Sequence, residues 1–217
     1  MRRTFRNKLY SLWDVAWIHI DRIWSTLWSR ASLWLQGCEC GSGLRTTGRC
    51  HFKSRCENGI RIGKNACLLA GWRSNRVGMS GPVLLTTLGE GRIDIGDDFG
   101  ASSLVISSRA SVTIGHDVKL GGNVRIFDHD FHSLDPSVRR TNADCDHCVS
   151  RAVSIGNDVF VGADAMILKG VKLGDRVIVG ARSVVTKSFE ADVVIAGNPA
   201  REVDFVPVSG LQTGSGP

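Results

Sequence analysis

"VSIGNDVFVGADAMILKGVKLGDRVIVGARSVV", residues 153–185, places an aliphatic side chain at every sixth position without a slip. A period of six fits neither the 3.6-residue turn of an α-helix nor the two-residue alternation of a half-exposed strand. It is typical of a parallel β-helix, in which each six-residue unit forms a short strand and a corner, and three units close a triangular turn. The positions of this column are Ile155, Val161, Ile167, Leu173, Val179 and Val185.

A second column strengthens the prediction of an all-β fold built from hexapeptide repeats. Small or β-branched residues follow four positions later, at Val159, Ala165, Val171, Val177 and Ser183. The same register appears upstream at Ile114, Leu120 and Ile126, and more faintly at Ile62, Leu68 and Ile95. Glycine follows the aliphatic position at Gly156, Gly162, Gly174 and Gly180, where we expect it to ease the corners.

Composition is that of a globular protein, with 42% hydrophobic and 22% charged residues among 217. The net charge of +6 favours an anionic neighbour such as a membrane surface or a nucleotide-like ligand. Nucleic acid is not expected as a partner, because no basic-aromatic recognition motif accompanies the charge. The seven scattered cysteines, without a signal-peptide pattern before them, indicate reduced thiols and a cytoplasmic location.

The pattern of apolar residues in segment 1–36 predicts an amphipathic helix, and this segment holds five of the six tryptophans. At about 100° per residue, Trp13, Trp17, Ile20, Trp24 and Trp28 share one face. One interpretation is a helix packed on its own domain or on a neighbouring subunit. The other is an interfacial helix at the inner face of the membrane, with the basic residues at 2, 3, 6 and 8 preceding it as contacts to anionic lipids.

Three segments therefore organise the chain. Residues 1–36 form the helical segment, and residues 37–203 form the β-helix domain. A loop over about 133–151 interrupts the periodicity and is expected to be extruded from the β-helix. Residues 204–217, ending in "SGLQTGSGP", have the composition of a flexible tail.

Several motifs resemble the hexapeptide-repeat O-acetyltransferases, a family that includes the maltose and galactoside acetyltransferases and bacterial polysaccharide O-acetyltransferases. The matching motifs are "IGNDVFVG", "ILKGVKLGD", "VGARSVVTK", "AGNPAR" and, in the loop, "HSLDPSVR". The resemblance covers roughly residues 90–203. It implies a left-handed β-helix, a homotrimer, and acetyl-CoA in a groove between subunits. It also implies direct acetylation of a sugar hydroxyl, without a metal.

The resemblance places the catalytic base at His132, which opens "HSLDPSVR". Imidazole titrates near neutral pH, so it can take the hydroxyl proton as attack proceeds and return one to the leaving thiolate. His129 is the alternative base. Arg139 falls where relatives also carry arginine, and Asp128 or Asp130 could orient an imidazole or the acceptor, or simply stabilise a turn.

The resemblance also implies a site for acetyl-CoA. Gly162 and Ala163 would lie beside its thioester arm, with Gly180 and Ala181 one coil further on. Cationic groups suit the nucleotide phosphates. The residues carried over for the phosphates are Thr186, Lys187 and Arg201.

On the acceptor side the chain departs from its relatives. Where they place an asparagine or aspartate, "FGASSLVIS" offers only Ser102 and Ser103. With Asp130 and Arg139, Ser102 completes the expected acceptor site. The departure hints at an acceptor other than a simple galactoside, such as a cell-surface polysaccharide or a lipid-linked glycan precursor.

Three rival interpretations remain open. A zinc site is disfavoured, because His116 lacks the closely spaced partner that a three-histidine site requires, and "CDHC" at 145–148 is a lone C-x-x-C. A non-catalytic trimeric scaffold that docks on a membrane or partner is a second. An N-acetyltransferase acting on an amino sugar is a third. The identity of the acceptor and the length of the acyl group are not encoded in these motifs.

Overall fold

The computed structural model describes residues 5–71 and 81–204, and of residues 5–11 the backbone only. The flexible tail expected at 204–217, except for residue 204, and the basic residues at 2 and 3 lie outside the described residues. Helix α1 (Phe5–Leu35) falls within the expected segment 1–36, but it includes Arg6 and Lys8, which were expected to precede it. No helix of the described residues is long and apolar enough to cross a membrane.

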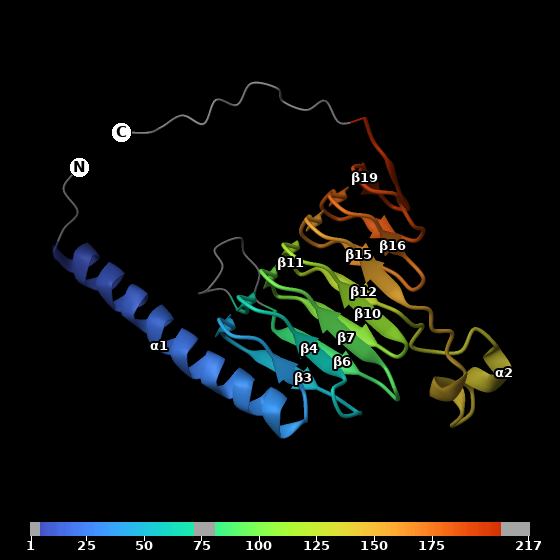
Figure 1. The fold of residues 1–217 in the computed structure, drawn as a ribbon, viewed down its shortest axis with the longest axis horizontal. Coiled ribbons are helices and arrows are strands. Elements are labelled where there is room, and N and C mark those ends of the chain that lie inside the picture. Colours follow the sequence, from blue (N-terminus) through green and yellow to red (C-terminus); the bar gives the residue numbers. More distant parts are fainter. Residues whose placement is uncertain (1–4, 72–80, 205–217) are drawn as a thin grey trace.

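Residues 39–202 form a left-handed β-helix with three sheets (Figure 1). Each complete coil contributes one strand to each of the three sheets. The first sheet contains β1 (Glu39–Cys40), β4 (Ile60–Ile62), β7 (Arg92–Ile95), β10 (Ser111–Ile114), β13 (Val153–Ile155) and β16 (Lys172–Leu173). The second contains β2 (Arg45–Thr47), β5 (Cys67–Leu69), β8 (Gly100–Ser102), β11 (Lys119–Gly122), β14 (Phe160–Val161), β17 (Ile178–Val179), β19 (Val194–Gly197) and β20 (Ala200–Glu202). The third contains β3 (Cys50–Lys53), β6 (Val83–Thr87), β9 (Val105–Ser108), β12 (Arg125–Phe127), β15 (Met166–Ile167) and β18 (Val184–Val185).

The hexad columns form the core, as predicted. Strand pairing stacks equivalent residues of successive coils, as with Ile126 on Ile167 and Ile167 on Val185. All six residues of the first column are at most 3% exposed, and the second column from Val159 to Ser183 is equally buried. All pairs are parallel except β19–β20, an antiparallel hairpin at the end of the β-helix.

The glycines of the repeat do a different job from the one expected. The left-handed backbone at the corners is adopted two residues later, by residues such as Asp164 and Arg182. At Gly162 a Cβ would lie 2.5 Å from the backbone nitrogen of Ala181 in the next coil. These glycines are therefore required by the close approach of adjacent coils, and the expectation that they ease the turns is wrong.

Helix α1 caps the open end of the β-helix with its polar face. The Thr26 hydroxyl accepts a hydrogen bond from the Thr46 amide (2.9 Å), and Asp21 accepts one from the Gly48 amide (3.0 Å). The Gln36 amide accepts from Ser54 N and donates to Phe52 O. Edge strands expose unpaired backbone groups, so this polar face satisfies strands that would otherwise pair with another chain. The interpretation that the helix packs on its own domain is therefore confirmed, but the packing uses the polar face, and the tryptophans point outward.

Candidate active site

The loop between β12 and β13 leaves the β-helix as one compact excursion, seen around α2 in Figure 1. It begins at residue 128, five residues before the expected bound of 133. An antiparallel bridge between His129 and Ser150 closes its base, where Asp130 N donates to Val149 O (2.9 Å). Arg151 N donates to Asp128 O (2.7 Å). The loop thus rises from a fixed, hydrogen-bonded base.

A buried aspartate–histidine pair forms that base. The carboxylate of Asp128 accepts from the Ser108 hydroxyl (2.7 Å), from the Arg109 and Ala110 amides (2.7 and 2.9 Å), and lies 3.0 Å from His129 Nδ1. Burial raises the pKa of Asp128, but these hydrogen bonds outweigh burial and the pKa is lowered from its ordinary value. Asp128 therefore joins the loop to the preceding coil as a buried carboxylate.

His129 is enclosed together with this carboxylate. Its side chain is 2% exposed, and its ring lies 4.7 Å from the ring of Phe131. The Nε2 atom is buried and has no hydrogen-bond partner among the described residues. An imidazole held in this way cannot meet a substrate hydroxyl in the single subunit.

His132 presents the opposite arrangement. Its side chain is 68% exposed, and its Nδ1 lies 2.6 Å from Asp144 Oδ2. The other oxygen of Asp144 accepts from the Ser133 amide (2.7 Å). The pKa of Asp144 is lowered mainly by the hydrogen bond from His132 and, to a smaller extent, by that from the Ser133 amide. Asp144 is therefore a carboxylate at neutral pH. A carboxylate at Nδ1 selects the tautomer whose basic nitrogen is Nε2.

Short helices frame this exposed pair. Asp135 caps α2 (Pro136–Arg139) by accepting from Ser137 N (2.8 Å), and Pro136 occupies the first turn of this helix. Arg139 Nη1 donates to Ser133 O (2.7 Å), so the expected acceptor-binding guanidinium also braces the loop. Asp144 opens the 3₁₀ helix η1 (Asp144–His147), and Asp146 of this helix lies 3.7 Å from Arg109.

Asp130 and Ser102 were both expected at the acceptor. Asp130 forms an ion pair with Lys169 of a later coil (2.6 Å between Oδ1 and Nζ), and its Oδ2 is buried without a partner. Ser102 is buried at the end of β8 in the second sheet. Lys169 was not anticipated, and no spacing in the sequence signals its ion pair with Asp130.

The residues expected to hold acetyl-CoA fall into two groups. Gly162, Ala163, Gly180 and Ala181 lie at the corner between the second and third sheets, following β14 and β17. Arg201 on β20 pairs with Ala196 at that end of the second sheet. Thr186 and Lys187 follow β18 and are exposed at the opposite edge of the third sheet, the edge from which the loop departs.

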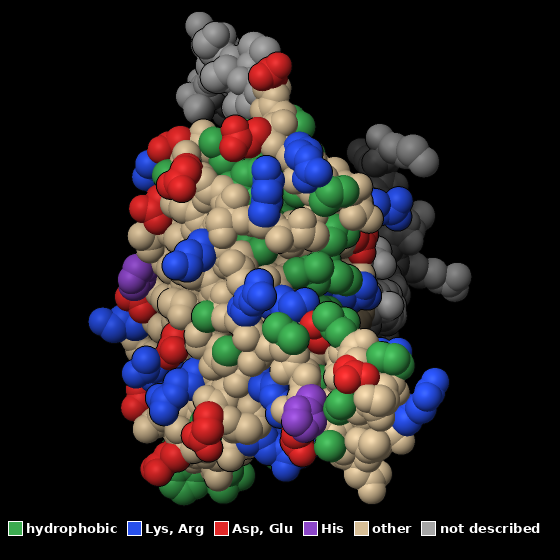
Figure 2. Space-filling model, turned by 90° about the vertical axis from the view of Figure 1, so that its right-hand side faces the viewer, with side chains coloured by type: hydrophobic (Ala, Val, Ile, Leu, Met, Phe, Trp, Pro, Cys, Tyr) green, Lys and Arg blue, Asp and Glu red, His purple; other side chains and the backbone are tan. Residues whose placement is uncertain are grey.

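The loop-bearing face carries positive charge. Figure 2 shows Lys and Arg side chains down the middle of this face, with hydrophobic side chains between them. Lys187 lies at this edge with its Nζ 5.1 Å from the centre of the Phe189 ring. Such a face suits an anionic ligand.

In the described part of the chain, no group of three or more His, Cys, Asp or Glu side chains is placed to hold a metal ion. All seven cysteines are unpaired. Of the "CDHC" segment, Cys148 Sγ donates to Asp144 O (3.4 Å) and burial raises its pKa. His116 Nδ1 accepts from the Asp97 amide (3.0 Å).

Comparison with known proteins identifies the repeat. Residues 152–187 match the family described as bacterial transferase hexapeptide (six repeats). This segment is thus a run of hexapeptide repeats, and the resemblance to hexapeptide-repeat transferases is confirmed in the repeat and in the fold.

Particular relatives extend this match. A Dictyostelium discoideum protein, provisionally named an acetyltransferase, is 41% identical over 117 residues, which is 54% of this chain and 59% of that protein. The chain therefore spans less than two thirds of that relative's length. Two structures of the Bacillus cereus N-acyltransferase AntD share the fold at 18% identity.

The two AntD structures differ in their ligands. A mutant with dTDP-4-amino-4,6-dideoxyglucose and coenzyme A has a TM-score of 0.61 and covers 80% of this chain and 87% of that one. The complex with dTDP and 3-hydroxybutyryl-CoA has a TM-score of 0.60 and covers 80% and 86%. At this identity the likeness establishes the fold alone.

Proposed function

We propose that this protein is an acetyl-CoA-dependent O-acetyltransferase that acts on a hydroxyl of a carbohydrate, such as a cell-surface polysaccharide or a lipid-linked glycan precursor. The observation that carries the proposal is the exposed His132, backed by the Asp144 carboxylate at 2.6 Å, on a loop of a hexapeptide β-helix. The acetyltransferase name of the Dictyostelium relative and the coenzyme A ligands of AntD support it.

The chemistry follows from the two nitrogens of His132. Nδ1–H donates to Asp144, so Nε2 carries the lone pair and accepts the proton of the acceptor hydroxyl. The hydroxyl oxygen forms a bond to the thioester carbonyl carbon, and the carbon–sulfur bond then breaks. The proton held on Nε2 passes to the departing thiolate, which leaves as coenzyme A. Asp144 stays ionised and stabilises the imidazolium during the step.

The division of the expected residues between two edges of the third sheet supports a homotrimer. In one subunit the loop and Lys187 lie at one edge, and Gly162 and Gly180 lie at the other. In a ring of β-helices the loop edge of one subunit would face the glycine corner of the next. The base and the thioester arm would then meet across the interface, with Arg201 and Lys187 on the nucleotide phosphates.

The proposal includes a peripheral position at the inner face of a membrane, with residues 1–36 as the contact. The structure turns the apolar face of α1 outward, with Trp24 and Trp28 each more than two thirds exposed. A glycan precursor attached to a lipid would be presented at this surface.

Thiol release from acetyl-CoA tests the proposal directly. The full chain is incubated with a panel of free sugars and nucleotide- or lipid-linked glycans, and His132→Ala serves as the inactive control. We expect release with at least one hydroxyl acceptor, and mass spectrometry of the product distinguishes an ester from an amide. Release only with amino sugars would make the protein an N-acetyltransferase.

Calorimetry with acetyl-CoA separates the enzyme from a scaffold. Absence of binding would overturn the proposal and leave the non-catalytic trimer. Lys187→Ala and Arg201→Ala are expected to raise the Michaelis constant for acetyl-CoA by about threefold to tenfold, since each removes a cation from a phosphate. Lys172→Ala, an exposed lysine on β16 of the first sheet, is the matched control.

A further inference from the structure

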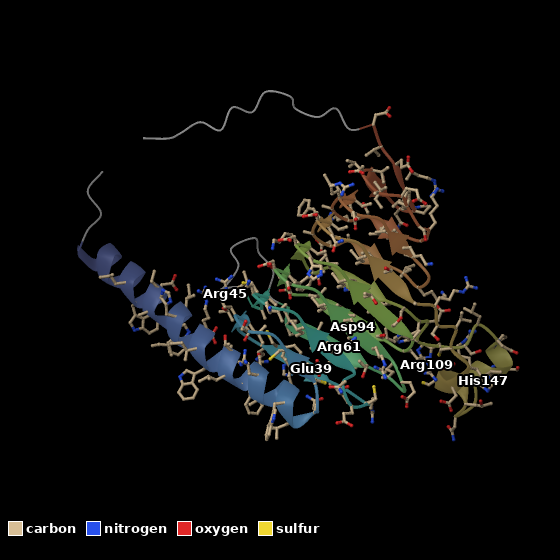
Figure 3. The ribbon with its side chains drawn as sticks, viewed as in Figure 1. Glu39, Arg45, Arg61, Asp94, Arg109 and His147 are labelled. Atoms are coloured by element: carbon tan, nitrogen blue, oxygen red, sulfur yellow. The ribbon has the colours of Figure 1, made fainter. Side chains whose placement is uncertain are left out.

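The outer side of α1 is a continuous apolar surface that nothing in the described part of the chain covers. We call it the tryptophan face and define it as Trp13, Trp17, Ile20, Trp24, Leu27 and Trp28. These side chains are 44–69% exposed. Figure 3 shows large ring side chains projecting from the side of α1 turned away from the strands. Apolar patches of this kind on soluble proteins mark interaction sites.

The helix cannot rotate to bury this face. Its opposite side is bonded to the first coil through Asp21, Thr26 and Ser29, whose hydroxyl lies 3.0 Å from the Thr46 hydroxyl. Turning the tryptophans inward would break these bonds and uncover the edge of β2. The face is therefore held outward by the fold.

Positive charge is concentrated in the part of the sequence that carries the tryptophan face. Residues 1–64 hold 12 of the 27 Lys and Arg residues but only 4 of the 21 Asp and Glu residues, a net charge of +8. The remaining residues have a net charge of −2. The net positive charge is thus concentrated in the segment that holds the helix, the first coil and the start of the second coil. In Figure 3, Arg45 of the first coil lies beside the middle of α1.

A groove joins the apolar and the cationic side chains. It has a volume of about 270 Å³ and runs between α1 and the start of β3. Trp24 and Trp28 line one wall, and Arg49 and His51 line the other. An arginine beside indole rings can pair with a phosphate while the rings lie at the level of lipid head groups.

We propose that the tryptophan face and this groove bind the surface of a phospholipid bilayer that contains anionic head groups, with α1 lying in the plane of the interface. The proposal deepens the membrane contact of the proposed function and rests on it, but not on the acetyl transfer. A second copy of the chain is a poorer occupant, because two such surfaces related by a twofold axis would bring their cations together.

Vesicle co-sedimentation of the full chain tests the proposal. The probes are phosphatidylcholine vesicles with and without phosphatidylglycerol. We expect at least about tenfold tighter binding to the anionic vesicles, since several cations reach the surface. Trp24→Ser with Trp28→Ser should weaken that binding by about tenfold or more, because two indoles leave the interface. Arg49→Gln should weaken binding to the anionic vesicles by about fivefold and leave the neutral vesicles unaffected.

Two matched controls should bind as the unsubstituted chain does. Leu12→Ser removes a side chain of the same helix that is 67% exposed but lies about 120° around the axis from Trp24. Lys172→Gln removes a cation from β16, at the far end of the first sheet. Because the replaced tryptophans are exposed, we expect the double variant to melt at the temperature of the unsubstituted protein. Thermal melts followed by circular dichroism check that the fold is intact.

Four results would overturn the proposal. Two are equal binding of the double tryptophan variant and equal binding to neutral and anionic vesicles. A third is a change in oligomeric state on light scattering without a change in vesicle binding, which would assign the face to a second copy. The fourth is displacement by phosphate. Inorganic phosphate at equal ionic strength should not displace the vesicles; displacement would reduce the site to a free-phosphate site. Thiol release from acetyl-CoA, measured without vesicles, should be unchanged in the tryptophan variant, which keeps failure here distinct from failure of the proposed function.

Discussion

Two histidines three residues apart, His129 and His132, each pair with an aspartate, and the two pairs differ in their surroundings. The pair of Asp128 and His129 is buried at the root of the loop, with side chains no more than 2% exposed. The pair of His132 and Asp144 stands on the loop, where the imidazole is 68% exposed. In both pairs a carboxylate meets Nδ1 of the ring.

The difference between the pairs comes from what else the carboxylate binds. Asp128 also accepts from two backbone amides and a hydroxyl of the preceding coil, so it joins two segments of the fold. Among the residues that the structure describes, Asp144 accepts one further hydrogen bond, from Ser133 within the loop. The same two residue types therefore serve architecture in one place and, in the mechanism proposed above, proton transfer in the other.

The largest difference between the two pairs is expected when each imidazole is removed in turn. His132→Ala should lower kcat by about 100-fold or more, since general-base catalysis contributes about that much. Acetyl-CoA affinity, measured by calorimetry, should change little. His129→Ala should retain turnover per folded molecule but melt at a lower temperature. Loss of turnover in the His129 variant, with turnover kept in the His132 variant, would reverse the assignment of the base.

Replacing the carboxylates should reverse the order of damage. Asp128→Asn is expected to cost about 2–4 kcal/mol of folding free energy, because a buried acceptor of several donors is disrupted. Asp144→Asn should melt close to the unsubstituted protein, since its carboxylate bonds only within the loop. Chemical denaturation of the two variants in parallel gives the comparison, and equal losses would contradict it.

The pH dependence of stability follows from the same carboxylate. The pKa of Asp128 is lower in the folded state than its ordinary value of about 3.9. Its contribution is therefore complete above about pH 4 and is lost as the pH falls toward the folded pKa. In Asp128→Asn this acid-dependent loss should be smaller than in the unsubstituted protein, as measured by thermal melts from pH 6 down to about pH 3. A slope identical to that of the unsubstituted protein would count against this role.

The fold was largely predictable, because the six-residue period directly reflects one side chain per strand stacked inside each coil. Ile155 and Val161 could be placed in the core without any knowledge of the rest. The loop was predictable only as a break in that period. Asp144 was missed because it meets His132 through the path of a twelve-residue excursion, which no spacing encodes.

Helix α1 was predictable as an amphipathic helix, but not its orientation. Its apolar face was correctly assigned, whereas its packing depended on the unpaired edge of β2, which is visible only once the coil is built. The role of Gly162 was misjudged for a similar reason. The nearest atom to its absent Cβ belongs to Ala181, nineteen residues away and one coil above.

A smaller effect is expected when the exposed pair is kept but its carboxylate is neutralised. Asp144→Asn should lower kcat by about tenfold with little change in KM for either substrate, because the amide no longer stabilises the imidazolium. Asp146→Asn is the matched control, since this residue shares η1 but its side chain is 80% exposed and does not contact His132. A rise in KM instead of a fall in kcat would give Asp144 a substrate-binding role.

The smallest effect should come from the brace behind the exposed pair. Arg139 Nη1 donates to Ser133 O, and Ser133 N in turn donates to Asp144. Arg139→Lys keeps the charge but loses the planar donor geometry, so we expect a fall in kcat of about twofold to fivefold. If Arg139 binds the acceptor, as the resemblance implies, the KM for the acceptor would rise and kcat would hold. Steady-state kinetics over acceptor concentration separates the two roles, and Arg140→Lys, the exposed neighbour, should change neither constant.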